Sequence, residues 1–294
     1  MNQSKTNSNW TWHVIAIVTI VVWAASFPCT KILLTNGVTP TEIFVYRTFI
    51  AYVGLLIASR FRVKLWGWRD EGLAMLLGLT GGTMYFVLQN FALDLTLLSD
   101  VVIVIAVNPL LTIMLSAIFL KEEHFSLKVV LGSVLAFLGV AVITLRNGLV
   151  WGDGLLGNLL AFLAALAWAL YCVIFRGVQS RHGILDITRK VMIYGAVFAL
   201  PVLFFVPTTP LSTLLRTDVV ANIVFLGLIC SMAAFFVWNM VIKKIGAIGS
   251  SNYLYLEPVL SMIIGAVWLG EPVGWIAVAG CAMVLLGVIL VEKK

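Results

Sequence analysis

The sequence predicts an all-α protein that crosses a membrane ten times, built as two inverted repeats of five helices. Three observations lead to this fold class. The chain has 294 residues, of which 62% are hydrophobic and 11% charged, whereas a soluble domain is about half apolar and about a quarter charged. Ten apolar stretches fill almost its whole length, and those of the second half repeat motifs of the first.

Each apolar stretch is close to the ~20 residues that a helix needs to cross the hydrocarbon core. Backbone groups in lipid must pair within their own segment, and the alternation typical of a β-barrel is absent, so the stretches are predicted to be helices. The predicted spans are 12–35, 41–59, 72–93, 98–120, 126–145, 155–175, 189–206, 219–242, 248–269 and 273–291.

Basic residues concentrate on one side of these spans. With the N-terminus inside, 15 of the 19 Lys and Arg residues fall in inner segments. The outer loops hold Arg146 and Arg216, while Lys31 and Arg47 lie within spans. Basic loops stay in the cytoplasm, so both termini are expected there. The net charge of +6 is then a topology signal and not a nucleic-acid surface.

The repeat is read from motifs that apolar helices rarely match by chance. Residues 86–122 align with 235–271 without a gap, and the first and sixth spans align with Trp23 opposite Trp168. An odd number of spans in each copy turns the second copy upside down. We expect repeats at 12–145 and 155–291, joined by an outer linker at 146–154. The identical pairs include Phe86/Phe235, Asn90/Asn239, Pro109/Pro258 and Glu122/Glu271.

Two matched prolines, Pro109 and Pro258, lie near the middle of the fourth and ninth spans, each after a polar residue, Asn108 or Glu257. Proline removes a backbone N–H and kinks the helix. Kinked helices at corresponding positions of two repeats indicate the substrate site of a transporter. Two structural kinks with local hydrogen bonds are the alternative.

Charged side chains inside the spans are candidates for function. An ionised carboxylate at mid-bilayer costs at least ~2.5 kcal/mol, so Glu257 is expected to be protonated, paired or in contact with water. It either hydrogen-bonds a kinked backbone or serves a substrate or proton. Lys31 and Arg47 either extend toward the interface or face the mouth of the path and attract a carboxylate.

Deep aromatic residues either pack the helices or line a cavity for a flat or apolar organic substrate. They are Trp23, Tyr85, Trp168, Tyr171, Tyr253 and Tyr255. Signatures of enzymes are missing: there is no Ser-His-Asp set, no His pair at metal-ligand spacing and no phosphate-binding glycine loop. No catalysis, metal, cofactor or ATP-driven pumping is therefore predicted.

The segment 255–272 reads Tyr-Leu-Glu-Pro-Val-Leu-Ser-x-Ile-Ile-Gly-x-x-x-Leu-Gly-Glu-Pro. With Asn108-Pro109 and Leu-Lys-Glu-Glu at 120–123, it resembles the EamA type of the drug/metabolite transporter superfamily over residues 12–291. The tryptophan-rich sequence is similar to the aromatic-amino-acid exporter branch. The resemblance implies a basket-like ten-helix monomer in the bacterial inner membrane, with the fifth and tenth helices at its periphery.

The resemblance also implies a central cavity and its lining. The residues at or near it would be Trp23, Tyr85, Asn90, Asn108, Trp168, Trp238, Asn239, Tyr253 and Glu257. The function expected is export of aromatic or other hydrophobic amino acids, or related small metabolites, by alternating access. Alternatives are an exporter of a nucleoside, sugar or cationic drug, and a membrane receptor that transports nothing. The first repeat has Asn108 at the position where the second repeat has Glu257, and this difference argues against a symmetric two-carboxylate proton mechanism.

The distribution of basic residues gives a test of topology. Reporter proteins fused after Gly148 and after Lys294 are expected on opposite sides of the membrane, the second in the cytoplasm. Signals from the same side would contradict the ten-span arrangement.

Overall fold

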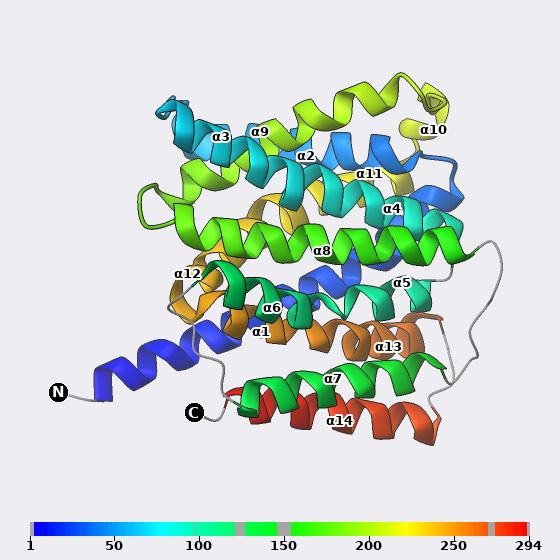
Figure 1. Ribbon diagram of the computed structural model, residues 1–294. Coiled ribbons are helices and arrows are strands. Elements are labelled where there is room, and N and C mark those ends of the chain that lie inside the picture. Colours follow the sequence, from blue (N-terminus) through cyan, green and yellow to red (C-terminus); the bar gives the residue numbers. More distant parts are fainter. Residues whose placement is uncertain (1–2, 97, 121–126, 146–153, 270–273, 293–294) are drawn as a thin grey trace.

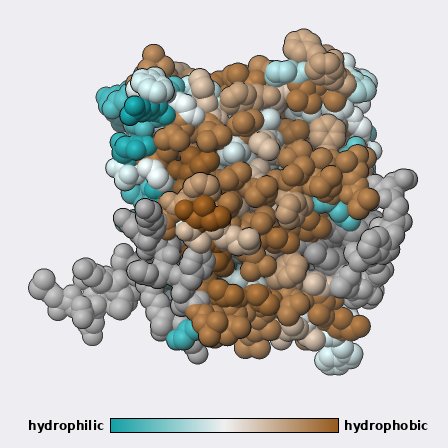
Figure 2. Space-filling model, in the orientation of Figure 1, coloured by the Kyte–Doolittle hydropathy of each residue, from teal (hydrophilic) through white to brown (hydrophobic). Residues whose placement is uncertain are grey.

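The computed structural model describes residues 3–96, 98–120, 127–145, 154–269 and 274–292, and every regular element in these ranges is a helix. Figure 1 shows the helices running back and forth in one bundle, with α1 starting and α14 ending at the same end. Apolar side chains cover most of the face seen in Figure 2. Helical stretches long and apolar enough to cross a membrane are Trp10–Thr35, Pro40–Ala58, Trp68–Leu95, Gly154–Val178 and Thr217–Leu260.

The predicted spans of the first half all coincide with helices. The span at 72–93 consists of three helical elements and the span at 98–120 of two. The elements are α1 (Gln3–Thr35), α2 (Pro40–Ala58), α3 (Trp68–Leu77), η1 (Gly78–Met84), α4 (Tyr85–Leu95), α5 (Leu98–Ile105), α6 (Asn108–Phe119) and α7 (Leu127–Leu145). Residues 146–153 of the predicted linker at 146–154 lie outside the described residues, as do Glu122 and Glu271, and Gly154 begins α8.

The second half follows the same plan. Its elements are α8 (Gly154–Val178), α9 (Ile184–Leu203), α10 (Leu211–Leu214), α11 (Thr217–Val224), η2 (Phe225–Ala234), α12 (Phe235–Asn252), η3 (Tyr253–Tyr255), α13 (Leu256–Leu269) and α14 (Trp275–Glu292). The break between the eighth and ninth predicted spans falls inside α12, at Gly246. This residue has φ 86° and ψ 168°, a conformation that glycine reaches without steric cost.

The start of the seventh span was predicted too late, at 189. The helix α9 begins at Ile184. Its first turns were missed because they carry polar residues that lower the local hydropathy, although these residues are bonded within the protein. Arg189 donates to Asp186 at 3.1 Å, and Lys190 pairs with Glu71 at 2.5 Å. Pairing lets these charges lie in a helix that packs against the bundle.

Both matched prolines lie where a helix begins anew. The helix α5 ends at Ile105 and α6 starts at Asn108, so Pro109 occupies the first turn of α6. Pro258 likewise lies in the first turn of α13, after the 3₁₀ turn η3. A proline costs nothing there, since N–H groups of the first turn have no helical partner. The predicted kinks are therefore helix breaks at corresponding positions.

A second matched irregularity is the pair of π-helical segments, η1 in the third span and η2 in the eighth. The alignment that pairs Phe86 with Phe235 also brings η1 onto η2. Packing is matched as well: a Cβ on Gly78 would lie 2.9 Å from the nitrogen of Gly195 on α9, and one on Gly227 would lie 2.7 Å from Ile50 on α2. Segments of this kind often mark functional sites.

Helices α7 and α14 pack against each other at the edge of the bundle, as expected for the fifth and tenth spans (Figure 1). A Cβ on Gly139 would lie 2.6 Å from the carbonyl oxygen of Gly280, and a Cβ on Gly287 would lie 2.5 Å from that of Gly132. In the repeat, Gly132 corresponds to Gly280 and Gly139 to Gly287. Such reciprocal contacts are those of a two-fold axis, as expected for two inverted copies of one five-helix unit.

This close packing gives a stability test. Gly139→Ala is expected to lower the free energy of unfolding in detergent by about 1–3 kcal/mol, the usual range for overpacking. Gly177→Ala is the matched control, because a Cβ on Gly177 of α8 would meet nothing within 4 Å. The control should be as stable as the wild type or more stable. Equal thermal stability of the two variants would contradict the packing of α7 on α14.

Candidate functional site

Four aromatic rings meet in the middle of the bundle, and they are two matched pairs of the repeat. Trp23 of α1 contacts Trp168 of α8, with ring centroids 5.5 Å apart. Phe86 of α4 lies 6.3 Å from Phe235 of α12. The ring centroids of Trp23 and Phe235 lie 6.5 Å apart, and so do those of Trp168 and Phe86. We call these four rings the axial aromatic cluster, because a residue that contacts its own copy lies on the axis relating the copies.

A small cavity lies against the axial aromatic cluster. Its volume is about 10 Å³, room for about one water molecule. Sites for small organic ligands usually measure about 300–1,000 Å³, so this form of the protein is closed around its centre. Helices α1, α4, α8 and α13 contribute the lining, which is Trp23, Ser26, Phe27, Tyr85, Phe86, Gln89, Trp168 and Glu257.

Glu257 brings a carboxyl group to this cavity, although its side chain is just 4% exposed. Among the residues that the structure describes, the carboxyl group has no hydrogen bond and no salt bridge. Tyr85 lines the same cavity. A buried polar group without a partner costs about 1–3 kcal/mol, so helix packing does not account for an acid at this position.

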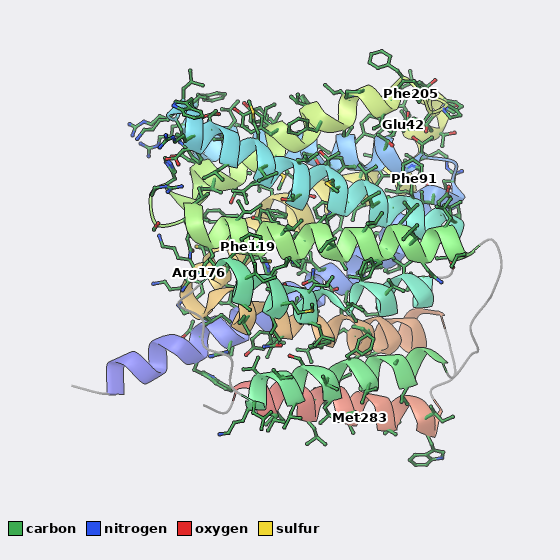
Figure 3. The ribbon with its side chains drawn as sticks, viewed as in Figure 1. Glu42, Phe91, Phe119, Arg176, Phe205 and Met283 are labelled. Atoms are coloured by element: carbon green, nitrogen blue, oxygen red, sulfur yellow. The ribbon has the colours of Figure 1, made fainter. Side chains whose placement is uncertain are left out.

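Glu42 of α2 shows how the same side chain is buried when it has partners. It is 5% exposed and accepts a hydrogen bond from the N–H of Thr209 at 2.9 Å. The hydroxyl groups of Thr209 and Thr39 also donate to it. Figure 3 shows Glu42 close to one end of the bundle, near Phe205. Its carboxyl group therefore ties the start of α2 to the segment before α10.

Arg47 lies one and a half turns further along α2 and is 1% exposed. Its Nε donates to the hydroxyl of Ser231 at 2.7 Å, and its guanidinium carbon lies 4.4 Å from the ring centroid of Phe86. Its Nη2 has no acceptor. No carboxylate of the described residues lies within salt-bridge distance of it. The guanidinium group thus rests on the ring that forms one wall of the cavity.

Four of the nine residues predicted for the site line this cavity: Trp23, Tyr85, Trp168 and Glu257. Trp238 lies one layer away, packed on Trp23 with centroids 5.1 Å apart.

The other four predicted residues lie outside the lining and are bonded within the protein. Asn90 donates to the carbonyl of Pro40, and Asn108 donates to that of Ala165, both at 2.9 Å. Asn239 accepts from Tyr171 at 2.5 Å and donates to Thr188 at 2.9 Å. Tyr253 pairs with Nδ1 of His13 at 2.5 Å. The structure thus does not bring Asn108 and Glu257 together in the cavity.

Ser26, Phe27, Phe86 and Gln89 line the cavity but were not predicted for it. The sequence held a signal for two of them. Phe86 is identical to its copy Phe235, and Ser26 ends the Trp-Ala-Ala-Ser motif that begins at Trp23. Gln89 and Phe27 had no such signal.

The end of the bundle that carries segments 59–67 and 179–183, here the basic end, is closed by contacts between the two repeats. Lys190 and Tyr194 of α9 both bond the carboxylate of Glu71 on α3. Arg189 donates to the hydroxyl of Ser59 at 2.8 Å and to the carbonyl of Arg62 at 2.5 Å. In the same region, Asp70 pairs with His182 at 2.7 Å and with Arg181 at 2.9 Å.

The opposite end, which carries segments 36–39 and 204–210, is here called the far end. It is closed by the bonds of Glu42 to Thr209 and by Lys31, whose Nζ donates to the carbonyl of Leu93 at 2.6 Å. Polar bonds therefore seal both ends of the bundle, while the axial aromatic cluster fills its middle.

A family model described as the EamA-like transporter family matches the chain twice, at residues 10–145 and 155–292. An uncharacterized transporter of Archaeoglobus fulgidus is 30% identical over 286 residues, covering 96% of this chain and 99% of that protein. A probable terminal-alkyne amino-acid exporter of Streptantibioticus cattleyicolor is 29% identical over 95% of this chain and 92% of the relative.

A solved crystal structure is similar in fold, with a TM-score of 0.78 at 21% identity. The match covers 96% of this chain and 98% of the other. The helical architecture is therefore shared over essentially the full length of both chains.

The contrast between the two buried glutamates gives a test. Glu257→Met removes an unpartnered polar group and is expected to raise the free energy of unfolding by about 1–3 kcal/mol. Glu42→Met leaves the donors of Thr209 and Thr39 unpaired and is expected to lower it by a similar amount. Thermal unfolding in detergent measures both. A loss of stability in Glu257→Met equal to that in Glu42→Met would give Glu257 a structural role.

Proposed function

Because the chain belongs to the EamA-like transporter family, we propose that it exports hydrophobic amino acids or related small metabolites through the cavity at the axial aromatic cluster. The observation that carries this proposal is the cavity itself. Its wall combines the matched rings of Trp23 and Trp168 with one unpartnered acid, Glu257. Aromatic walls suit an apolar side chain, and a carboxylate suits an ammonium group. The relative named as a probable amino-acid exporter supports the same class of substrate.

Alternating access is the mechanism proposed for this movement. The inverted repeats give the bundle two related ways to open, one toward each end. Opening the basic end requires the bonds of Glu71 to Lys190 and Tyr194 to break, while the far end stays closed by Glu42 and Thr209. Opening the far end requires the reverse. The closed cavity then corresponds to an intermediate through which both forms pass.

The setting proposed for this cycle is the bacterial inner membrane, with the protein acting as a monomer and both termini in the cytoplasm. The basic end would then face the cytoplasm. Arg176, labelled at that end in Figure 3, and the cations of segments 59–67 would lie beside the lipid headgroups. Positively charged loops favour that side.

Two other kinds of function make different demands on the cavity. Export of a nucleoside or sugar needs several hydrogen-bonding groups, and the wall offers those of Ser26, Gln89, Glu257, Tyr85 and the Nε1 of Trp168. A receptor that transports nothing would have no need of matched helix breaks in the fourth and ninth spans. Both remain as outcomes of the transport test.

Purified protein in liposomes is the direct test. Liposomes loaded with an unlabelled amino acid are expected to accumulate the same labelled amino acid by exchange, with phenylalanine, tryptophan and leucine above serine and lysine. Glu257→Gln is expected to reduce exchange by about tenfold or more, the effect of losing one charge-assisted hydrogen bond. Asp94→Asn is the control, because Asp94 is exposed at the end of α4.

Two results would contradict the proposal. Exchange of nucleosides or sugars without exchange of any amino acid would assign another substrate class. Wild-type exchange by Glu257→Gln at mildly acidic and mildly basic pH would remove the acid from the transport site.

A further inference from the structure

Arg47 is a buried cation with no counter-ion among the described residues. Two other buried cations pair with carboxylates, Arg189 with Asp186 and Lys190 with Glu71. The partly buried Lys31 donates to the carbonyl of Leu93. Arg47 has the hydroxyl of Ser231 and the face of Phe86, and its Nη2 is unpaired. Removing a guanidinium group from water without an anion is costly. A folded protein that keeps such a group has a use for its charge.

The position of Arg47 connects it to the transport cavity. Phe86 carries the guanidinium group 4.4 Å from its ring centroid and also lines the cavity. Tyr85, the residue before Phe86, lines the cavity together with Glu257. The unpaired acid therefore faces a cavity whose wall includes Phe86, the ring that carries the unpaired cation.

We propose that Arg47 binds the carboxylate of a transported α-amino acid whose ammonium group is held at Glu257. This inference rests on the function proposed above, and it names the substrate by its charges: a zwitterion with an apolar side chain. A guanidinium group matches a carboxylate with two parallel hydrogen bonds. The bond from Nε to Ser231 fixes the plane of the group, so the two hydrogen bonds would come from Nη1 and Nη2, of which Nη2 is buried without an acceptor.

The same geometry sets the selectivity. A zwitterion neutralises both buried charges at once and has no net charge of its own. A cationic compound without a carboxylate leaves Arg47 unpaired and is repelled by it, and a simple carboxylate leaves Glu257 unpaired. Because the closed cavity holds about one water molecule, the ring of Phe86 must turn to let a substrate reach both groups.

The test needs no variant in its first stage. Exchange in liposomes is measured for the wild type with L-phenylalanine and L-leucine, and with their carboxamides, which keep the ammonium group and lose the carboxylate charge. The carboxamides are expected to compete about tenfold to a hundredfold more weakly than the amino acids. Equal competition by each amino acid and its carboxamide would overturn the inference and leave amino-acid export intact. Failure of the wild type to exchange either amino acid would overturn the proposed function itself.

Variants then assign the effect to Arg47. Arg47→Gln is expected to bring the affinity for the amino acids down to that for the carboxamides, with the carboxamides nearly unchanged. Arg47→Lys keeps the charge but not the paired donors and should recover part of the difference. Lys243→Gln, the control, should keep the full wild-type difference, since Lys243 is exposed on α12. Retention of the full difference by Arg47→Gln, or its loss in Lys243→Gln, would overturn the assignment.

Discussion

The contact of Trp23 with Trp168 is the interaction on which the rest of the arrangement depends. Each tryptophan is the repeat copy of the other, and their edge-to-face packing, at an interplanar angle of 84°, holds the two halves together on their common axis. Phe86 and Phe235 complete the cluster in the same symmetric way. Because the cavity lies against these rings, the candidate site is located at the axis that relates the two repeats. The glycine contacts of α7 with α14 repeat the relation at the edge of the bundle.

The buried polar and charged residues discussed above differ in whether they have a bonding partner. Glu42, Lys31, Lys190, Asn108 and Asn239 are bonded to other parts of the chain, so their burial supports the fold. Glu257 and the Nη2 of Arg47 have no such partners among the described residues. Proteins keep destabilising groups of this kind where function requires them. Phe86 carries the guanidinium group of Arg47 on its ring and lines the same cavity as Glu257, so both charged groups without partners belong to the candidate site.

The sequence was sufficient to predict the helical spans and the two-repeat architecture, because hydropathy and the matched Trp, Asn and Pro residues are local signals. It also located the helix breaks at Pro109 and Pro258. The start of α9 was missed, since pairing of Arg189 and Lys190 with distant residues is invisible to hydropathy. The π-helical segments η1 and η2 were also missed. They pack closely on α9 and α2, and such long-range contacts leave no local pattern in the sequence.

The candidate site could be predicted in part. Depth and aromatic character led to Trp23, Tyr85 and Trp168, and the cost of a mid-bilayer acid led to Glu257. Polarity alone could not tell Asn90, Asn108 and Asn239, which bond the backbone or neighbouring side chains, from residues that face a cavity. Arg47 had two readings in the sequence, and only its neighbours in three dimensions distinguish an extended surface cation from a buried one.

Distance measurements between spin labels on the two ends test most directly whether the halves move around the axial cluster. One pair joins exposed Lys64 and Ser180 at the basic end, and the other joins exposed Asp94 and Leu215 at the far end. On addition of an exchanged amino acid, we expect the two distances to change in opposite directions, one end opening as the other closes. Distances that stay fixed, or that lengthen together at both ends, would contradict alternating access around this axis.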